Sequence, residues 1–288
     1  MFSICYRGRI VEYNRPVVMG IINASPDSFY AGARGVVPAD AAHMALRMLE
    51  QGADIIDIGA CSTRPGAEVP DAAEEWGRLR PVLEQVRYAV GAEAVVSVDT
   101  FRASVARSAV ETGMADMVND VAGAMLDPEM IDTVADLRVP YVLTHMRGTP
   151  ATMQHFTEYG PDGVAAVVLR ELAATLDRLT LAGVADVVVD PGFGFAKTME
   201  QNYALLAALP AFVEALGRPV LAGLSRKSMI TRLLGIPAED ALPATAALNM
   251  AALERGASIL RVHDVAEAVQ VVKMFDTLKN TSVCPTLE

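Results

Sequence analysis

Hydrogen-bonding or ionisable side chains follow the short apolar runs of this sequence, one group after another. They are Asn23, Asp57, Asp99, Asn119, Asp120, His145, Asp190, Ser225, Lys227, Arg261 and His263. Each residue alone has a structural explanation, because Asp, Asn and Ser also cap helix N-termini, as Asp99 and Asp190 are placed to do. Their recurrence after every run instead predicts a polar pocket of mixed charge, in which lysine, arginine and histidine offset the repulsion between carboxylates.

The segment DIIDIGACSTRPG (54–66) shows how one apolar run leads into a loop that carries such residues. The run contains Asp57 and then gives way to small and polar residues, among them Thr63 and Arg64. A second long loop of small residues covers 24–37. Loops of this length without their own secondary structure are often lids, so we expect both at the rim of the pocket.

Four segments repeat one pattern of helix end, glycine and apolar strand. A helical stretch leads to a glycine at the position of a left-handed C-terminal cap, followed by Ala-Asp or Ala-Ser and an apolar run. The segments are 50–59, 111–120, 181–190 and 254–264, with Gly52, Gly113, Gly183 and Gly256 at the cap. A recurring unit of helix, cap and strand is typical of α/β proteins.

Four further apolar runs fill the gaps between these segments, at 17–22, 94–98, 141–144 and 219–224. Eight strands that are apolar on both faces, alternating with amphipathic stretches, predict a single-domain (β/α)8 TIM barrel over residues 1–288. Active sites of such barrels lie at the C-terminal ends of the strands, where the polar residues stand. Residues 1–14 are expected to form a hairpin that plugs the barrel floor. A doubly wound open sheet stays the alternative, because a sequence does not show closure.

The composition excludes several classes of protein. Apolar residues make up 52% of the chain, enough for a large core, and the net charge of −11 disfavours nucleic acid and acidic membranes as partners. No apolar run approaches the roughly 20 residues of a membrane span, and the N-terminal stretch lacks the apolar core of a signal peptide. Cys5, Cys61 and Cys284 are odd in number and lack paired spacing. Neither a disulfide framework nor a zinc site is therefore expected, and the predicted compartment is the cytoplasm.

Three other residues carry specific expectations. Ser225 precedes a short amphipathic helix within 224–235 and is expected to be its N-cap, at a helix end that attracts a carboxylate or phosphate. Met146 stands beside His145 at a strand end and is expected to line a flat apolar ligand. Cys61 is expected to be a small loop residue and not a nucleophile, since no histidine lies near it in sequence.

Eight motifs, in this order, resemble those of the bacterial dihydropteroate synthase family of pterin-binding barrels. They are MGIINASPDSF (19–29), DIGACSTRPGA (57–67), SVDT (97–100), VNDVAG (118–123), THMRGTP (144–150), DPGFGF (190–195), GLSRKS (223–228) and LRVHDV (260–265). The resemblance covers about residues 17–275 and the set is highly specific. It implies the same barrel fold, a target of sulfonamides and a transferase of folate biosynthesis.

The implied reaction condenses 6-hydroxymethyl-7,8-dihydropterin diphosphate with p-aminobenzoate, giving 7,8-dihydropteroate and pyrophosphate. The resemblance also implies Mg²⁺ as the cofactor, with Asn23 at the metal, and a homodimer is expected. The positions that match the pterin pocket are Asp99, Asn119, Asp190 and Lys227, with Arg261 over the ring. A buried carboxylate such as Asp190 suits the adjacent N–H donors of a pterin edge, and Lys227 suits its carbonyl edge.

The other substrate sites follow from the same resemblance. Asn23, Arg261 and His263 match the diphosphate site; Thr63, Arg64 and Pro65 match the loop that completes the aminobenzoate site, with Ser225 near its carboxylate. The residues implied in catalysis are Asp99, Thr63, Arg64 and Lys227.

The two predicted lid loops depart from the family pattern. Cys61 stands where the family usually has a glutamate, and Ser25 and the 30–35 stretch replace a threonine and an aspartate-bearing sequence. Two other functions remain open. One is a catalytically silent pterin-binding paralogue. The other is a methyltransferase acting between methyltetrahydrofolate and a corrinoid protein, against which the SRKS and STRPG motifs count.

Overall fold

The structure, a computed structural model, describes residues 2–24, 37–61 and 70–281. The expectations for Ser25, Thr63, Arg64, Pro65 and Cys284 concern residues outside these ranges. Among the residues described, no helix combines the length and the apolar character that a membrane span requires.

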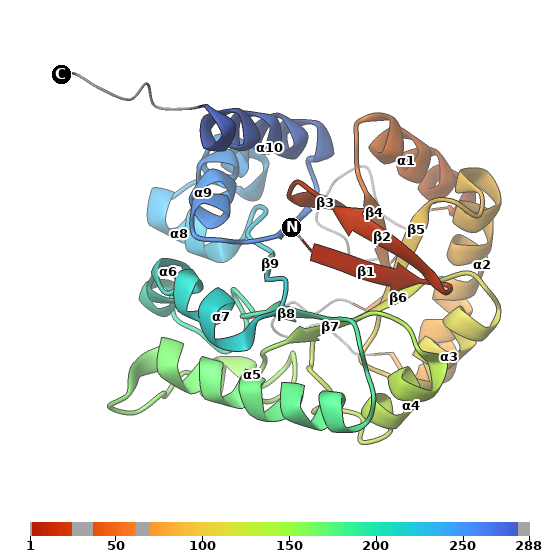
Figure 1. The fold of residues 1–288 in the computed structure, drawn as a ribbon, viewed down its shortest axis with the longest axis horizontal. Coiled ribbons are helices and arrows are strands. Elements are labelled where there is room, and N and C mark those ends of the chain that lie inside the picture. The colour runs from red at the N-terminus through yellow and green to blue at the C-terminus, as the bar shows by residue number, and fades with distance from the viewer. Residues whose placement is uncertain (1, 25–36, 62–69, 282–288) are drawn as a thin grey trace.

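Eight parallel strands form the predicted barrel (Figure 1). In chain order they are β3 (Val17–Asn23), β4 (Ile55–Gly59), β5 (Val95–Asp99), β6 (Met117–Asp120), β7 (Tyr141–Thr144), β8 (Val187–Asp190), β9 (Leu221–Ala222) and β10 (Ile259–Val262). Around the sheet the order is β8-β7-β6-β5-β4-β3-β10-β9. A parallel bridge between Val189 and Val220 joins its two outer strands. This bridge closes the barrel and excludes the open sheet.

Helices surround the strands and bury their apolar sides against them (Figure 1). They are α1 (Pro38–Glu50), α2 (Ala72–Val90), α3 (Ala103–Glu111), α4 (Met130–Leu137), α5 (Gly163–Leu181), α6 (Met199–Ala207), α7 (Leu209–Leu216), α8 (Ser228–Leu234), α9 (Leu242–Glu254) and α10 (Val265–Asn280), with 3-10 turns η1 (Met153–His155) and η2 (Ala238–Ala241). The four glycines of the sequence repeat have φ values of 103°, 73°, 89° and 94°. The predicted left-handed caps are therefore confirmed.

The aspartates of the repeated Ala-Asp pair serve the barrel floor. Asp54 and Asp116 each precede a strand, and their Oδ2 atoms accept the backbone N–H groups of Val18 and Val96, both at 2.9 Å. A carboxylate at this point satisfies a donor at the start of the neighbouring strand, where the ladder has no carbonyl to offer. The repeat thus stabilises the end of the barrel opposite the predicted site.

The N-terminal hairpin plugs that floor, as predicted. Strands β1 (Phe2–Tyr6) and β2 (Arg9–Tyr13) pair antiparallel and lie across the near end of the barrel in Figure 1. Ile4 and Tyr6 are 2% and 5% exposed, and they pack against the lower interior side chains of the barrel, such as Met19 and Ile55. The floor is thereby sealed by apolar contacts, which leaves the opposite mouth for a ligand.

Candidate active site

A shared arginine joins two carboxylates at the mouth of the barrel. Arg261 on β10 donates from Nε to Asp57 Oδ2 at 2.7 Å and from Nη2 to Asp99 Oδ2 at 2.6 Å. Asn119 on β6 donates to the same Asp57 Oδ2 at 2.9 Å. Asp57 is fully buried, and its Oδ1 has no hydrogen-bond partner among the described residues. Four strands therefore contribute to one polar network in which Arg261 balances two acids.

The charges in this network shift one another's proton affinity. Burial raises the pKa of Asp99 above its usual range, against the lowering effect of Arg261. Burial alone would lower the pKa of Arg261, but Asp57 and Asp99 outweigh it and hold that pKa above the usual value. Arg261 is consequently a fixed positive charge with its guanidinium already positioned by acids.

The turn after β8 begins at the predicted residue Asp190 and is contacted by a second one, Lys227, which is the N-cap of α8. Asp190 is buried, and its Oδ1 accepts the N–H of Gly192 at 2.8 Å. Lys227 donates from Nζ to the carbonyl oxygen of Phe193, and the same Nζ lies 4.3 Å from the ring centroid of Phe195. Burial raises the pKa of Asp190 and lowers the pKa of Lys227 to about 8, and each group opposes the shift of the other. Neither Asp99 nor Asp190 caps a helix: Arg102 precedes α3, and Asp190 bonds within its own turn.

The expectation that Ser225 caps the short helix is wrong. Helix α8 begins at Ser228 with Lys227 at its N-cap, and no side chain caps it. Ser225 Oγ instead lies 3.0 Å from His263 Nδ1 and accepts the backbone N–H of His263 at 3.2 Å. The backbone turns sharply after Ser225, because Arg226 has a φ of 55°. The guanidinium of Arg226 donates two hydrogen bonds of 2.8 Å to Asp264. This ion pair ties the segment before α8 to the start of α10 and holds Ser225 against the rim histidine.

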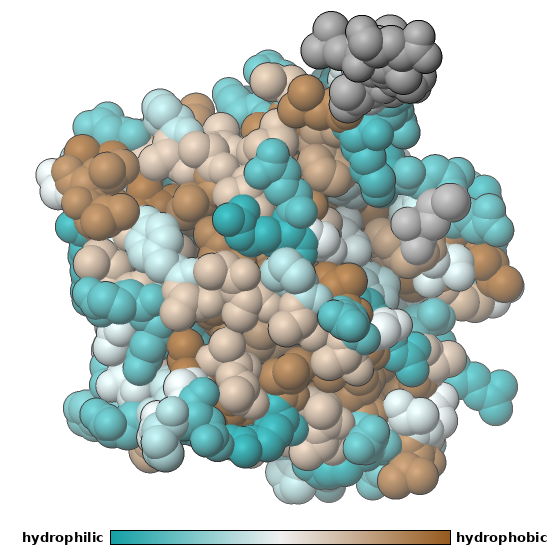
Figure 2. Space-filling view, turned by 60° about the vertical axis from the view of Figure 1, so that its left-hand side comes forward, coloured by the Kyte–Doolittle hydropathy of each residue, from teal (hydrophilic) through white to brown (hydrophobic). Residues whose placement is uncertain are grey.

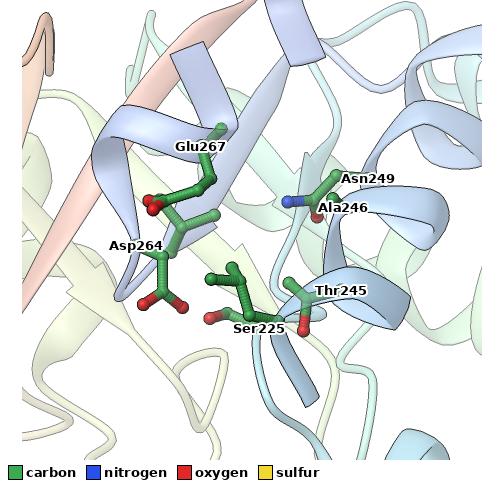
Figure 3. A pocket seen from close by; sticks show the side chains of 9 residues that line it. Ser225, Thr245, Ala246, Asn249, Asp264 and Glu267 are labelled. Carbon is green, nitrogen blue, oxygen red and sulfur yellow. The ribbon is translucent and has the colours of Figure 1, made fainter. Parts of the chain in front are cut away.

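Behind Ser225 a small hollow separates α9 from α10 (Figure 3). Thr245 and Asn249 line it from α9, and Glu267 lines it from α10. The Oδ1 atom of Asn249 is buried without a partner in the described part of the chain. The hollow is too narrow for the substrates that the sequence predicts.

Asn23 and Met146 complete the described residues of the prediction. Asn23 ends β3 at the mouth, half-buried, and its amide makes no hydrogen bond within the ranges described. Met146 is 1% exposed and packs with Phe101, Val121 and Met153 in a separate apolar cluster. Asn23 is therefore available to a ligand or ion, whereas Met146 lies inside the wall and presents little surface.

The described residues contain no group of three or more His, Cys, Asp or Glu side chains arranged to hold a metal ion. A Mg²⁺ ion does not need one, because it keeps several waters and is commonly bound by one or two protein oxygens plus substrate phosphates. The free amide oxygen of Asn23 fits that requirement, and it is the residue expected at the metal.

A further buried cluster lies beneath the turn after β8, and the sequence analysis did not predict it. Lys197, 4% exposed, lies 3.0 Å from His145 Nδ1, while His145 Nε2 lies 2.7 Å from Glu171. The sequence places His145 at a strand end but assigns it no specific role. The sequence signal for Lys197 is its position at the end of the apolar stretch GFGFAK, where a side chain exposed to solvent is not expected.

Cys61 fits its expected passive role. Burial raises the pKa of its thiol to about 12, with Glu75 and Asp99 adding to the shift. The side chain stays a thiol at neutral pH and is a poor nucleophile.

Comparison with known proteins assigns this barrel to a family. The family described as pterin binding enzyme matches residues 19–263. A dihydropteroate synthase of Synechocystis is 42% identical over 267 residues, covering 92% of this chain and 90% of its own. Among solved structures, a Yersinia pestis dihydropteroate synthase with a sulfonamide drug complex has a TM-score of 0.90 at 35% identity, covering 97% of this chain and 100% of that one. A Xanthomonas albilineans enzyme in complex with 7,8-dihydropteroate has a TM-score of 0.84 at 39% identity, covering 97% and 100%.

These matches extend over both the barrel and its mouth. The chain therefore belongs to the pterin-binding enzymes and, within them, to the dihydropteroate synthase family.

Proposed function

We propose that the chain is a dihydropteroate synthase, a transferase that joins 6-hydroxymethyl-7,8-dihydropterin diphosphate to p-aminobenzoate and releases pyrophosphate. The observation that carries the proposal is the charge-balanced mouth, with Asp190 facing Lys227 and Arg261 held between Asp57 and Asp99. It occurs in a chain that matches such enzymes over almost its full length.

The pterin is bound by groups that lie on rigid elements. Asp190, buried at the end of β8, accepts the paired N–H donors of the aminopyrimidine edge. Lys227 turns from the Phe193 carbonyl to donate to the carbonyl edge of the pterin, and Asn119 adds an amide contact from β6. The planar guanidinium of Arg261 stacks on the ring. Met146 supports the apolar side of this pocket from behind, within its own cluster.

The diphosphate lies at the rim, beside Asn23, Arg261 and His263. Arg261 supplies a positive charge there, whereas Asn23 and His263 supply neutral hydrogen-bonding groups, because burial lowers the pKa of His263 to about 4. A polyanionic substrate requires such a local positive charge in a chain whose net charge is −11. Mg²⁺ held by Asn23 and the phosphates would neutralise the charge of the leaving pyrophosphate.

The reaction breaks the bond between the pterin methylene carbon and the diphosphate oxygen, which departs with the electron pair. The dihydropterin ring delocalises the positive charge left on the methylene. The chain stabilises this cation with Asp99 and the departing anion with Arg261 and His263, by groups positioned before reaction. The neutral aniline nitrogen then forms the new bond to carbon and loses a proton to solvent, so no strong base is needed.

The second substrate is held by a site that Thr63, Arg64 and Pro65 complete, with Ser225 near its carboxylate. Closure over the cation excludes water and orders the substrates, pterin diphosphate first and aminobenzoate second. Because the Yersinia relative forms a complex with a sulfonamide drug, we extend sulfonamide binding to this chain as part of the proposal.

The enzyme acts as a homodimer in the cytoplasm. Exposed apolar side chains on α8 and α10 support a contact between copies, with Leu233, Leu234, Met274 and Leu278 each more than half exposed. Figure 2 shows apolar residues, in brown, interrupting the polar surface on the side of the barrel turned forward. A sedimentation experiment that finds only monomer at micromolar concentration would remove this part.

The function is tested by incubating the protein with both substrates and measuring dihydropteroate by mass spectrometry. Product is expected with Mg²⁺ and should disappear in excess chelator, then return when Mg²⁺ is restored. Pterin binding without product would identify a silent paralogue. Methyl transfer between methyltetrahydrofolate and a corrinoid protein, without dihydropteroate formation, would favour the methyltransferase.

A further inference from the structure

The turn that carries Asp190 is held from below by one buried lysine. Lys197 Nζ donates to the carbonyl oxygens of Gly192 and Phe195, both at 2.9 Å, and lies 3.0 Å from His145 Nδ1. An ammonium group has three N–H donors, and three acceptors meet it here. The match leaves no donor of Lys197 free for a substrate.

The contacts of Lys197 fix the state of the histidine next to it. The Glu171 carboxylate can only accept, so the ring proton of His145 is assigned to Nε2, 2.7 Å from Glu171 Oε2, and Nδ1 is left to accept from Lys197. Arg147 binds the other oxygen of Glu171. A chain of hydrogen bonds thus runs from the half-exposed Glu171, through the buried imidazole, to the lysine beneath the turn.

The residues that Lys197 holds stand on either side of the pterin-recognition groups. Gly192 accepts Lys197 with its carbonyl and donates its own N–H to Asp190. Phe195 accepts Lys197 with its carbonyl, and its ring lies under the ammonium group of Lys227. Between them the carbonyl of Phe193 accepts Lys227.

The turn packs tightly against the end of the neighbouring strand β7. Gly192 has a φ of 74°, and a Cβ there would lie 1.9 Å from the carbonyl oxygen of His145. The backbone therefore packs directly on the end of β7. There the Gly192 carbonyl accepts both the Lys197 ammonium group and, at 3.2 Å, the N–H of Phe195. On the other side Asn202 accepts the N–H of Gly194 at 2.6 Å, and Thr198 caps helix α6.

We propose that Lys197 is a positioning residue for pterin recognition, which fixes the Gly192–Phe195 turn so that the Asp190 carboxylate and the Lys227 ammonium group face the two edges of the ring. His145 and Glu171 hold Lys197 in place. This inference rests on the proposed function for the identity of the ligand, and it assigns Lys197 no contact with substrate.

The test replaces Lys197 with methionine, which keeps the length of the side chain and removes its donors. Calorimetry with 6-hydroxymethyl-7,8-dihydropterin diphosphate is expected to show a dissociation constant raised at least about tenfold, the scale of losing charged hydrogen bonds. The KM for aminobenzoate at saturating pterin should stay within about twofold of the wild type, because the contacts of Lys197 are to His145, Gly192 and Phe195 and to none of the residues proposed for that site. The matched control is Lys273→Met on the exposed face of α10, which should change neither value.

A purely structural lysine would give a different pattern. A folded Lys197→Met protein with unchanged pterin affinity, or with both substrates weakened equally, would overturn the proposal. If that variant does not fold, Glu171→Gln decides. Its side chain is 42% exposed, so the substitution is mild, and it should still weaken pterin binding measurably and selectively. Unchanged pterin affinity in Glu171→Gln would then overturn the proposal. A wild-type protein that binds the pterin but forms no product would refute the proposed reaction and not the role of Lys197, because that role is tested by pterin affinity.

Discussion

At the scale of single residues, the site works by pairing opposite charges before any substrate arrives. Arg261 serves two acids, and Lys227 lies close enough to Asp190 for each to oppose the pKa shift of the other. Burial still raises the pKa of Asp99 and Asp190, but the cations limit the rise that an isolated buried carboxylate would show. The sequence predicted these residue types at the strand ends correctly. It did not predict that Asp57 is the common acceptor of Asn119 and Arg261, because these partners lie 62 and 204 residues away along the chain.

Asp190→Asn is expected to weaken pterin binding by about 2–3 kcal/mol, the cost of losing a charged hydrogen-bond partner. The amide keeps the shape of the side chain but replaces one acceptor oxygen with a donor that opposes the pterin N–H groups. Calorimetric titration with the pterin diphosphate measures the effect. Asp132→Asn on the exposed side of α4 is the control and should bind like the wild type. Unchanged affinity in Asp190→Asn would remove this residue from the pocket.

Lys197 should also leave a mark on the pH dependence of stability. Burial lowers the pKa of Lys197 to about 7. The nearby cations Lys227 and Arg147 add to this lowering, and the carboxylates Asp190 and Glu171 oppose it. A lysine in an unfolded chain has a pKa of about 10.4. His145 faces it as a neutral ring. Between these two pH values the unfolded chain binds a proton on Lys197 that the folded chain does not bind. The contribution of Lys197 to the free energy of unfolding therefore increases as the pH rises.

Urea unfolding of the wild type and Lys197→Met between about pH 7 and pH 10 measures this gain. The wild type should become more stable relative to the variant as pH increases. A difference that is constant over this range would mean that the buried ammonium group has an ordinary pKa.

At the scale of elements, one end of the barrel provides stability and the other carries the candidate site. The repeated Ala-Asp pairs and the N-terminal hairpin stabilise the floor, and the strand ends carry the polar groups of the mouth. The strands, the glycine caps and the hairpin were predictable because they follow from local patterns of apolar residues and turns. The Ser225 cap was predicted wrongly because the φ of 55° at Arg226 delays the helix to Ser228, and this depends on Asp264, far along the chain.

Ile4→Ala is expected to lower the free energy of unfolding by about 2–5 kcal/mol, since it empties a buried position between the hairpin and the barrel floor. The KM values of both substrates should not change, because the floor lies at the other end of the barrel. Ile10→Ala is the matched control. Ile10 is 68% exposed on the same hairpin, and its loss should change stability by less than about 0.5 kcal/mol. Equal destabilisation by the two variants would show that the hairpin does not plug the barrel.

The loop around Thr63 and Arg64 is expected to serve the second substrate only. Thr63→Ala and Arg64→Ala should strongly reduce turnover with aminobenzoate while pterin diphosphate binding stays near the wild-type value. Steady-state kinetics and calorimetry on the same preparations separate the two effects. Should both variants lose pterin binding as severely as Asp190→Asn, this loop would belong to the pterin pocket.

At the scale of the whole molecule, an acidic barrel brings two cationic side chains to the mouth, where the anionic substrate is proposed to bind. The net charge of −11 is spread over the chain, whereas Lys227 and Arg261 converge on the mouth. The matches to the Synechocystis and Yersinia pestis dihydropteroate synthases cover 90% and 100% of those chains, so the whole barrel, and not an isolated motif, supports the function. The sequence did not predict whether the sheet closes into a barrel. The bridge between Val189 and Val220 closes it, by pairing the two outermost strands of the sheet.

The most direct test of the account is pyrophosphate release from the pterin diphosphate, measured with and without p-aminobenzoate in the presence of Mg²⁺. We expect rapid release only when both substrates are present, with one dihydropteroate formed for each pyrophosphate. Without the amine, the enclosed cation recombines with the bound pyrophosphate, whereas capture by the amine makes the departure permanent. Absence of release with both substrates, or release at the same rate without aminobenzoate and without dihydropteroate, would contradict the assignment of this barrel as a dihydropteroate synthase.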